Sequence, residues 1–484
     1  MSGPSRSAER TDAGEEHPFG LYESTASESS QRESLTSGDV PVAVYGLGKM
    51  GLPLATVYAE TTSNVTGVDV DPDVVDTVSG GNCHIRGEPG LAADLRAAVD
   101  TGALEATTDG TRAASRARIH VIIVPTLLDD ANEPNLTTVE SVADDIAAGL
   151  QPGDLVIAES TLPPGTCKSV LRPHLSERSG LDPDAFGLAF CPERTSSGTA
   201  LRDIRGQYPK VVGGVDKEST RAAALVYDEL SSNDVHPVSD ATTAEAVKVF
   251  EGIYRDVNIG LANELARACE SFGISVREAI ETANDLPMCQ LHDPGPGVGG
   301  HCIPFYPHFL LSRSETEMPL TRTARRVNDS MPGVTVARLE RELEADDVTL
   351  SDASVAVLGI TYRPGVEETR ASPALGVIDE LTERGSAVYG VDPLVDPSEF
   401  GAKPLEVDDL VDRDLDAVVL VTPHEEFDQI DWTHLESLVV FDGRDALDLE
   451  SEPFEHHRGY TLGGPTKGSS KGNGRTAETG GGER

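Results

Sequence analysis

A cysteine follows a cluster of glycines in the stretch GPGVGGHCIPFYPHFL, residues 295–310. Free cysteine is among the most buried residue types, so Cys302 could be a small core side chain. It could instead be a nucleophile that a flexible, glycine-rich backbone lets a substrate approach closely. The stretch by itself leaves both interpretations open.

A second glycine cluster has the spacing of a phosphate-binding turn. Gly46, Gly48 and Gly51 in VAVYGLGKMGLP form GxGxxG after a β-branched run, and Asp69 ends the next such run. These glycines would allow a tight turn, close approach of a pyrophosphate and helix–strand packing, with the helix N-terminus facing the phosphates. Asp69 would bind the adenosine ribose diol and repel the 2′-phosphate of NADP. We therefore predict an NAD site; the alternative is that the glycines serve only the turn.

Short β-branched runs that could position these residues occur in two sets of four. Each run precedes a segment that can be helical, such as ESVADDIAAGL or ALGVIDELTERG. Apolar runs that alternate with helices indicate a parallel sheet covered on both faces. We predict an α/β fold with two doubly wound, Rossmann-like parallel-sheet domains. The runs are residues 41–48, 64–72, 118–126 and 154–161, then 354–362, 387–395, 416–424 and 438–446.

A long amphipathic segment separates the two sets. Within residues 240–269, apolar residues recur at three- and four-residue steps from Val247 to Leu265, which predicts a long helix. Such a helix could join the two domains and form a dimer face, or it could be an ordinary core helix.

The predicted organisation has three folded parts between two polar tails. We expect a first α/β domain at 39–235, a central helical or dimerisation domain at 236–330 and a second α/β domain at 331–462. Composition predicts a disordered tail at 1–38 and a flexible tail at 463–484.

The charge balance excludes several classes of partner. Lys and Arg number 39 against 82 Asp and Glu, a formal net charge of −43 at pH 7. This argues against binding nucleic acid or an anionic membrane, and such self-repulsion suits strong salt. We expect a halophilic, cytoplasmic origin. None of the six cysteines forms a CxxC pair, so we expect neither a metal site nor a disulfide framework. We expect no signal peptide and no membrane span, because long apolar runs are lacking.

The order and spacing of the motifs resemble the UDP-glucose/GDP-mannose dehydrogenase family from about Val42 to about Leu447. The form GVGGHCIP is similar to the branch that acts on UDP-N-acetylhexosamines, especially UDP-N-acetylmannosamine. The segments on which this resemblance rests are GLGKMGLP, VDVDP, EPGL, VPT, ESTLPPGT, CPER, VVGG, AEAVK, YRDVNI, GVGGHCIP, TYRPGVEETRASPAL and DGR.

The resemblance implies an NAD-dependent, four-electron oxidation of a sugar C6 alcohol to a carboxylate. It also implies a UDP-sugar-binding C-terminal domain, a homodimer or higher homo-oligomer, and a product used for surface polysaccharide or glycan synthesis. Alternative substrates are UDP-glucose and UDP-N-acetylglucosamine. A simple two-electron dehydrogenase and a non-catalytic nucleotide-sugar binder are alternatives from other classes.

Three catalytic roles follow from the resemblance. Cys302 would add to the aldehyde intermediate, and the thiohemiacetal would be oxidised to a thioester that water cleaves. Lys248 would stabilise oxyanions at C6, and Glu193 would act as general acid and base. The alternatives are a solvated lysine on a helix face and a surface or helix-capping acid.

The resemblance also implies two sets of binding residues. Thr126 and Thr161 would lie near the second ribose and the nicotinamide, unless they simply cap strand ends. A guanidinium suits a pyrophosphate or carboxylate, although arginine often forms surface ion pairs. The cofactor set is Gly46, Gly48, Lys49, Met50, Gly51, Asp69, Thr126 and Thr161; the substrate set is Arg255, Asn258, Gly299, Gly300, His301, Arg370 and Arg444.

Three positions depart from the family pattern. Gly252 stands where the family has Asn four residues after the helix lysine, and Tyr306 stands where it has Asp four residues after the cysteine. Met288 replaces an Arg that is frequent in the related branch. A neutral phenol cannot act as a carboxylate base, so the changes at positions 252 and 306 bear on the efficiency of thioester hydrolysis, whereas Met288 points to a different contact between subunits.

Overall fold

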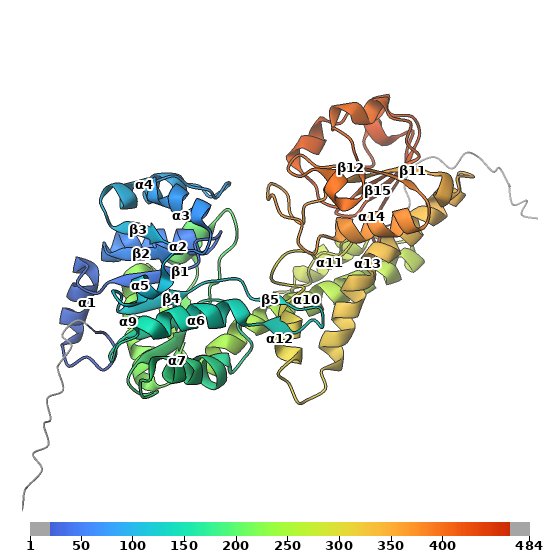
Figure 1. Cartoon of the computed structure of the whole chain (residues 1–484). Coiled ribbons are helices and arrows are strands. Elements are labelled where there is room, and N and C mark those ends of the chain that lie inside the picture. The colour runs from blue at the N-terminus through green and yellow to red at the C-terminus, as the bar shows by residue number, and fades with distance from the viewer. Residues whose placement is uncertain (1–19, 465–484) are drawn as a thin grey trace, which may run out of the picture. The chain divides into compact units, whose positions relative to one another are not determined.

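The computed structural model describes residues 20–464, which divide into two compact units (Figure 1). The first unit ends at Lys248 and the second begins at Val249. The division falls inside the long helix α10 (Ala241–Phe272), which confirms the helix predicted over residues 240–269.

Within residues 20–248, the main sheet has the strand order β10-β9-β8-β7-β4-β1-β2-β3. Neighbouring strands are parallel except β8 and β9, which pair antiparallel. A short antiparallel pair, β5 (Leu127–Leu128) and β6 (Pro134–Asn135), follows β4. The sheet strands are β1 (Val42–Tyr45), β2 (Val65–Val68), β3 (Leu104–Thr107), β4 (Ile119–Ile122), β7 (Leu155–Ala158), β8 (Gly187–Phe190), β9 (Lys210–Gly214) and β10 (Val235–Pro237).

Helices cover both faces of this sheet, because successive strand residues point to opposite sides. One face packs with α1, α2, α4 and α9, and the other with α5, α6, α7 and the start of α10. The helices are α1 (Glu28–Ser37), α2 (Gly51–Thr62), α3 (Pro72–Ser79), α4 (Leu91–Asp100), α5 (Gly110–Ala114), α6 (Thr137–Gly149), α7 (Arg172–Ser179), α8 (Ala200–Arg202) and α9 (Lys217–Leu230).

Within residues 249–464, a second sheet has the order β13-β12-β11-β14-β15-β16, and all its strand pairs are parallel. Helices α10, α11, α13 and α14 contribute to the core on one of its faces. The strands are β11 (Ser354–Leu358), β12 (Ala387–Val391), β13 (Lys403–Pro404), β14 (Ala417–Leu420), β15 (Val439–Asp442) and β16 (Arg458–Thr461). The helices are α11 (Val276–Asn284), α12 (Tyr306–Leu311), α13 (Pro319–Glu344) and α14 (Pro373–Glu383).

In each unit the first strand along the chain lies inside the sheet: β1 lies between β2 and β4, and β11 lies between β12 and β14. This is the strand order of a doubly wound sheet, so the predicted pair of Rossmann-like domains is confirmed. Each of the eight predicted runs contains a strand. The sequence interpretation missed β3, β5, β6, β8, β9, β10, β13 and β16. β13 has two residues and β10 three, too few to show a pattern.

The prediction of a disordered tail over residues 1–38 is wrong for residues 20–38. Ser27 caps α1 by accepting a hydrogen bond from the Ser30 N–H, and Leu21 and Leu35 are buried. Arg32 forms ion pairs with Asp228 and Glu229 of α9. Buried apolar side chains, the ion pairs of Arg32 and a hydrogen bond from Arg221 to the Leu21 carbonyl thus hold this polar segment on the first unit. Residues 1–19 lie outside the described residues.

The prediction of a flexible tail at 463–484 is wrong for Gly463. The carbonyl of Gly463 accepts a hydrogen bond from the Val276 N–H at 2.9 Å, so this residue belongs to the second unit. Residues 465–484 lie outside the described residues. From residue 20 to residue 464, no helix has the length and apolar character that crossing a bilayer requires.

Candidate functional site

The turn after β1 has the geometry that a dinucleotide needs. Gly46 has φ +101°, and a Cβ there would lie 2.4 Å from the Ile123 carbonyl oxygen. A Cβ at Gly51, the first residue of α2, would lie 1.9 Å from the Gly46 carbonyl oxygen. A Cβ at Gly48 would meet nothing within 4 Å. Two glycines therefore shape the turn, and the third leaves open space beside the N-terminus of α2, where a pyrophosphate is stabilised.

Asp69 follows β2 and holds the same turn. Its Oδ2 accepts a hydrogen bond from the Leu47 N–H at 2.8 Å, and its Oδ1 accepts one from the Asp71 N–H at 3.0 Å. An ionised carboxylate has about four acceptor sites, so capacity remains for a ribose diol. Asp69 thus both fixes the loop and presents a carboxylate at the carboxyl end of the sheet.

Two further strand ends contribute polar groups. Ser160 after β7 accepts a hydrogen bond from the Val124 N–H at 2.9 Å and donates one to the Val124 carbonyl at 2.8 Å, which ties two strand ends together. The Thr126 hydroxyl is buried and has no hydrogen-bond partner within residues 20–464. A buried hydroxyl of this kind suits a bound polar ligand. Thr161 is half-buried, and Lys49 of the turn is exposed.

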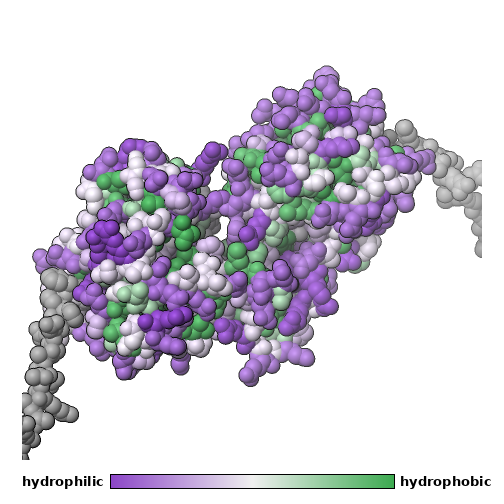
Figure 2. Space-filling view, viewed as in Figure 1, coloured by the Kyte–Doolittle hydropathy of each residue, from purple (hydrophilic) through white to green (hydrophobic). Residues whose placement is uncertain are grey.

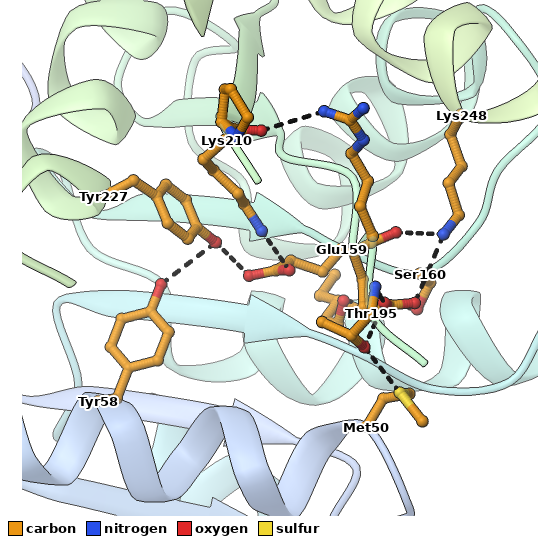
Figure 3. Close-up of polar contacts among 12 residues, drawn as sticks. Met50, Tyr58, Glu159, Ser160, Thr195, Lys210, Tyr227 and Lys248 are labelled. Carbon is orange, nitrogen blue, oxygen red and sulfur yellow. Dashed lines mark hydrogen bonds and ion pairs between the residues drawn. The ribbon is translucent and has the colours of Figure 1, made fainter. Parts of the chain in front are cut away.

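Lys248 (labelled in Figure 3) and Glu193, predicted from distant motifs, form an ion pair in the first unit. The Lys248 ammonium donates to the Glu193 backbone carbonyl and lies 3.5 Å from its Oε2. Thr195 donates to the Glu193 carboxylate through its N–H and its hydroxyl, and that hydroxyl lies 2.9 Å from the sulfur of Met50. The pair therefore connects to the dinucleotide turn.

The pKa of Glu193 is lowered. Burial, the largest influence, acts to raise this pKa, but the Lys248 ammonium and the Thr195 donors outweigh it. The side chain is therefore a carboxylate at neutral pH, in a state that accepts protons.

Sequence reasoning missed a polar cluster beside this pair (Figure 3). Glu159 accepts hydrogen bonds from the Tyr227 hydroxyl and from the Lys210 ammonium, which lies 2.7 Å from its Oε2. Tyr58 of α2 donates to the Tyr227 hydroxyl at 3.4 Å. One cavity is lined by Met50, Glu193 and Thr195 together with Glu159, Lys210 and Tyr227. The scarcity of lysine, eight in the chain, is a signal that could have pointed to Lys210.

In the second unit, Cys302 is exposed at the start of a turn into α12. Its carbonyl accepts hydrogen bonds from the Phe305 and Tyr306 N–H groups at 3.1 and 3.0 Å. Nε2 of His301 lies 2.7 Å from Oε2 of Glu368, and the Gly300 N–H donates to the Arg370 carbonyl at 2.9 Å. The Cys302 loop is thus held against the segment that follows β11. Because Cys302 is exposed, the alternative that it is a small side chain of the core is wrong.

The glycines before Cys302 make room for this protein's own side chains. A Cβ at Gly295 would lie 2.3 Å from Nη1 of Arg444, and a Cβ at Gly299 would lie 2.7 Å from Cβ of Tyr362. Close approach of a substrate, the reason predicted from sequence, is therefore not needed to explain Gly295 and Gly299.

The predicted substrate residues of the second unit differ in their surroundings. Arg444 donates from Nε to the Val421 carbonyl at 2.9 Å, and burial, together with nearby Arg277, lowers its pKa. Asn258 bonds the Gln290 carbonyl and the His292 N–H, which fixes that segment on α10. Arg255 and Arg370 are exposed.

The strand ends of the second unit repeat the arrangement of the first. Gly359 after β11 has φ +83°, and a Cβ there would lie 2.1 Å from the Thr422 carbonyl oxygen. Asp392 after β12 accepts hydrogen bonds from the N–H groups of Ile360 and Thr361 at 2.6 and 2.9 Å. Gly359 and Asp392 thus match Gly46 and Asp69, although the sequence there lacks GxGxxG.

A doubly wound domain with this turn, followed by a lysine–carboxylate pair, defines a dehydrogenase that uses a dinucleotide. Three models of the UDP-glucose/GDP-mannose dehydrogenase family match the chain: the NAD binding domain at residues 40–231, the central domain at 242–330 and the UDP binding domain at 356–449. The chain belongs to this family. It is an NAD-dependent nucleotide-sugar dehydrogenase, and NAD is its cofactor.

Similar proteins span nearly the whole folded region. UDP-N-acetyl-D-mannosamine dehydrogenase of Pyrococcus horikoshii is 34% identical over 415 residues, which cover 84% of this chain and 96% of that protein. NDP-N-acetyl-D-galactosaminuronic acid dehydrogenase of Ralstonia nicotianae is 36% identical over 415 residues, 83% of this chain and 95% of that protein. The solved structure of UDP-D-ManNAc dehydrogenase from Pyrococcus horikoshii matches with a TM-score of 0.81 at 33% identity, covering 88% of this chain and 99% of that one.

Proposed function

We propose that the protein oxidises the C6 hydroxyl of a UDP-N-acetylhexosamine, with UDP-N-acetyl-D-mannosamine as the first choice, to the uronate. The observation that carries this proposal is the exposed Cys302 thiol on an anchored turn, in a chain that also has the NAD turn. A two-electron dehydrogenase has no use for such a thiol. The names of the similar proteins support an N-acetylhexosamine substrate, and the matched UDP binding domain supports a UDP-sugar.

The NAD site fits its ligand through the open space at Gly48, the Asp69 carboxylate and the buried Thr126 hydroxyl. Bound NAD⁺ accepts a hydride in each of the two oxidations. Overall, one alcohol, two NAD⁺ and one water give one carboxylate, two NADH and three protons.

The side chains divide the remaining work. The Lys248 ammonium stabilises negative charge on the C6 oxygen, and the Glu193 carboxylate takes a proton from water or from the thiohemiacetal hydroxyl. The Cys302 thiolate adds to the aldehyde carbon, and oxidation of that thiohemiacetal forms a thioester. Water then cleaves the C–S bond, which releases the carboxylate and returns the thiol.

The proposal includes the setting in which the enzyme works. The net charge of −43 supports activity in strong salt and a halophilic source, and hydrophilic residues cover much of the face shown in Figure 2. Exposed Phe250, Tyr254 and Leu261 on α10 support a homodimer through this helix. A cytoplasmic location and a product used in polysaccharide or glycan synthesis complete the proposal.

The test measures NADH formed per sugar consumed in molar salt, with UDP-N-acetylmannosamine, UDP-N-acetylglucosamine and UDP-glucose side by side. Two NADH per sugar with one substrate are expected, and Cys302→Ser should halt turnover after the first oxidation. Cys289→Ser is the matched control, because Cys289 is a partly buried thiol of the same unit. One NADH per sugar from the unmodified enzyme, or full activity of Cys302→Ser, would contradict the thioester route.

A further inference from the structure

Two departures from the family pattern, Gly252 and Tyr306, are in direct contact in the second unit. A Cβ built on Gly252 would lie 2.0 Å from Cδ2 and 2.7 Å from Cγ of the Tyr306 ring. No side chain fits in such a space, so the phenol ring lies directly on the backbone of α10. Tyr306 is 6% exposed, and its ring also meets that of Phe309 edge-on at 6.1 Å.

The same tyrosine closes the turn that carries the exposed thiol. The Tyr306 N–H donates to the Cys302 carbonyl at 3.0 Å, the spacing of one helical turn. Cys302 is thus at the exposed end of a short turn whose other end is buried against α10. This one hydrogen bond joins the backbone of Tyr306 directly to the backbone of Cys302.

The pair is also reciprocal in size. The resemblance predicts Asn at position 252 and Asp at position 306, two side chains of nearly equal size. This chain has no side chain at position 252 and a large ring at 306, so the space given up on α10 is the space that the ring takes. An asparagine at 252 would overlap Tyr306. Tyr306 is therefore a packed part of the loop, with its ring in the place where the side chain of residue 252 would lie.

We propose that Tyr306 is a positioning residue for Cys302, and that it acts through the contact of its ring with Gly252. The ring holds the thiol in the place where it captures the aldehyde. Gly252 lies one turn after Lys248 on α10. The contact therefore also fixes the position of the thiol relative to this helix. This proposal rests on the proposed function only in that the group captured by the thiol is an aldehyde. The contact between Tyr306 and Gly252, and its effect on the thiol, do not depend on the substrate.

A double-mutant cycle on thiol reactivity tests the contact without any substrate. The rate of Cys302 alkylation by iodoacetamide, followed by peptide mass, is compared in wild type, Gly252→Ala, Tyr306→Ala and the double variant. Each single change should alter the alkylation rate by about fivefold or more. In the Tyr306→Ala background, Gly252→Ala should have no further effect on the rate. The coupling energy between the two positions is then about 1 kcal/mol or more. Independent, multiplying effects would overturn the proposal.

Tyr306→Phe is the matched control, because it keeps the ring and removes only the hydroxyl. It should react and turn over within about twofold of wild type. A large loss of alkylation rate or of turnover in Tyr306→Phe would show that the hydroxyl, and not the ring, positions the thiol. That result would overturn the proposal. Tyr306→Leu serves in the place of Tyr306→Ala if the latter fails to fold, as judged by thermal unfolding and NAD⁺ binding.

Turnover gives a second readout. Gly252→Ala should lower kcat for NADH formation by about 10²-fold, the usual effect of misplacing a reacting group by about 1 Å, while the KM for NAD⁺ is unchanged. A raised KM for NAD⁺ with unchanged kcat would contradict the proposed positioning of Cys302. If wild type oxidises no UDP-sugar, the proposed function fails and the alkylation cycle still decides the contact.

Discussion

The Lys210 ammonium lies 2.7 Å from Oε2 of Glu159, and the Glu159 side chain is 1% exposed. The same ammonium lies 4.3 Å above the ring of Tyr227, whose hydroxyl donates to the other oxygen of Glu159. Burial and the nearby Glu159 raise the pKa of Tyr227, so its hydroxyl remains a donor. The carboxylate is therefore satisfied on both oxygens although it is almost fully removed from water.

Replacing Lys210 by Met should destabilise the first unit strongly. Removing one partner of a buried ion pair leaves the other charge uncompensated, at a cost of about 3–5 kcal/mol in free energy of unfolding. Urea unfolding at fixed molar salt measures it. Lys217→Met, at the exposed first residue of α9, is the matched control and should change stability by about 0.5 kcal/mol or less. Equal effects of the two substitutions would show that the pair is not important for stability.

Replacing Asp69 by Asn should weaken NAD⁺ binding and relax the discrimination against NADP⁺. A hydrogen bond to a charged acceptor contributes about 1.5–3 kcal/mol, so the dissociation constant for NAD⁺ should rise about tenfold or more. Titration calorimetry with both cofactors measures the change. Asp76→Asn, on the exposed side of α3, controls for the loss of one negative charge. Unchanged affinity in Asp69→Asn would remove the carboxylate from the cofactor site.

Glu245 should make stability depend on pH. It is fully buried on α10, and its carboxylate accepts hydrogen bonds from the N–H groups of Gly165 and Cys167 at 2.5 and 2.7 Å. Burial raises the pKa of Glu245 to about 7, and those two donors offset part of the effect. Between its ordinary pKa and about 7 the folded state binds the proton more tightly than the unfolded state does, so the free energy of unfolding falls as pH rises through this window.

Glu245→Gln removes this titration. The unfolding free energy of wild type minus that of the variant should fall by about 3 kcal/mol from pH 4.5 to pH 7. At higher pH this difference should stay constant. Chemical unfolding at a series of pH values measures it, whatever the absolute stability of the variant. A difference that is constant across the window would show that Glu245 does not titrate there.

A charged α10 face should prevent association. Phe250 is 55% exposed and Leu261 is 47% exposed on this helix. If they meet a second copy, Phe250→Asp with Leu261→Asp should halve the mass measured by light scattering in molar salt, to that of a single 51.2 kDa chain. Leu127→Asp, an exposed leucine of the first unit, should leave the mass unchanged. A single-chain mass for wild type would contradict the dimer.

Local patterns in the sequence were sufficient for the fold class and for the cofactor. The β-branched runs predict the central strands of both sheets because their residues are buried on both faces. The glycine spacing predicts the turn after β1 because a Cβ at Gly51 would meet the Gly46 carbonyl, five residues earlier, whereas the close contact at Gly46 is with the distant Ile123. The family motifs added Lys248 and Glu193, whose catalytic roles stay predictions.

Tertiary structure alone decided the features that join distant residues. Glu159, Lys210 and Tyr227 come from three separate elements, so no local pattern marks their cluster. Helix α1 is held by its packing on the first unit, which its polar composition does not predict. Gly252 and Tyr306 each look like a lost functional group in the sequence, and only the folded chain shows that one occupies the space left by the other. Steric complementarity depends on positions in space, and these are set by the packing of whole elements.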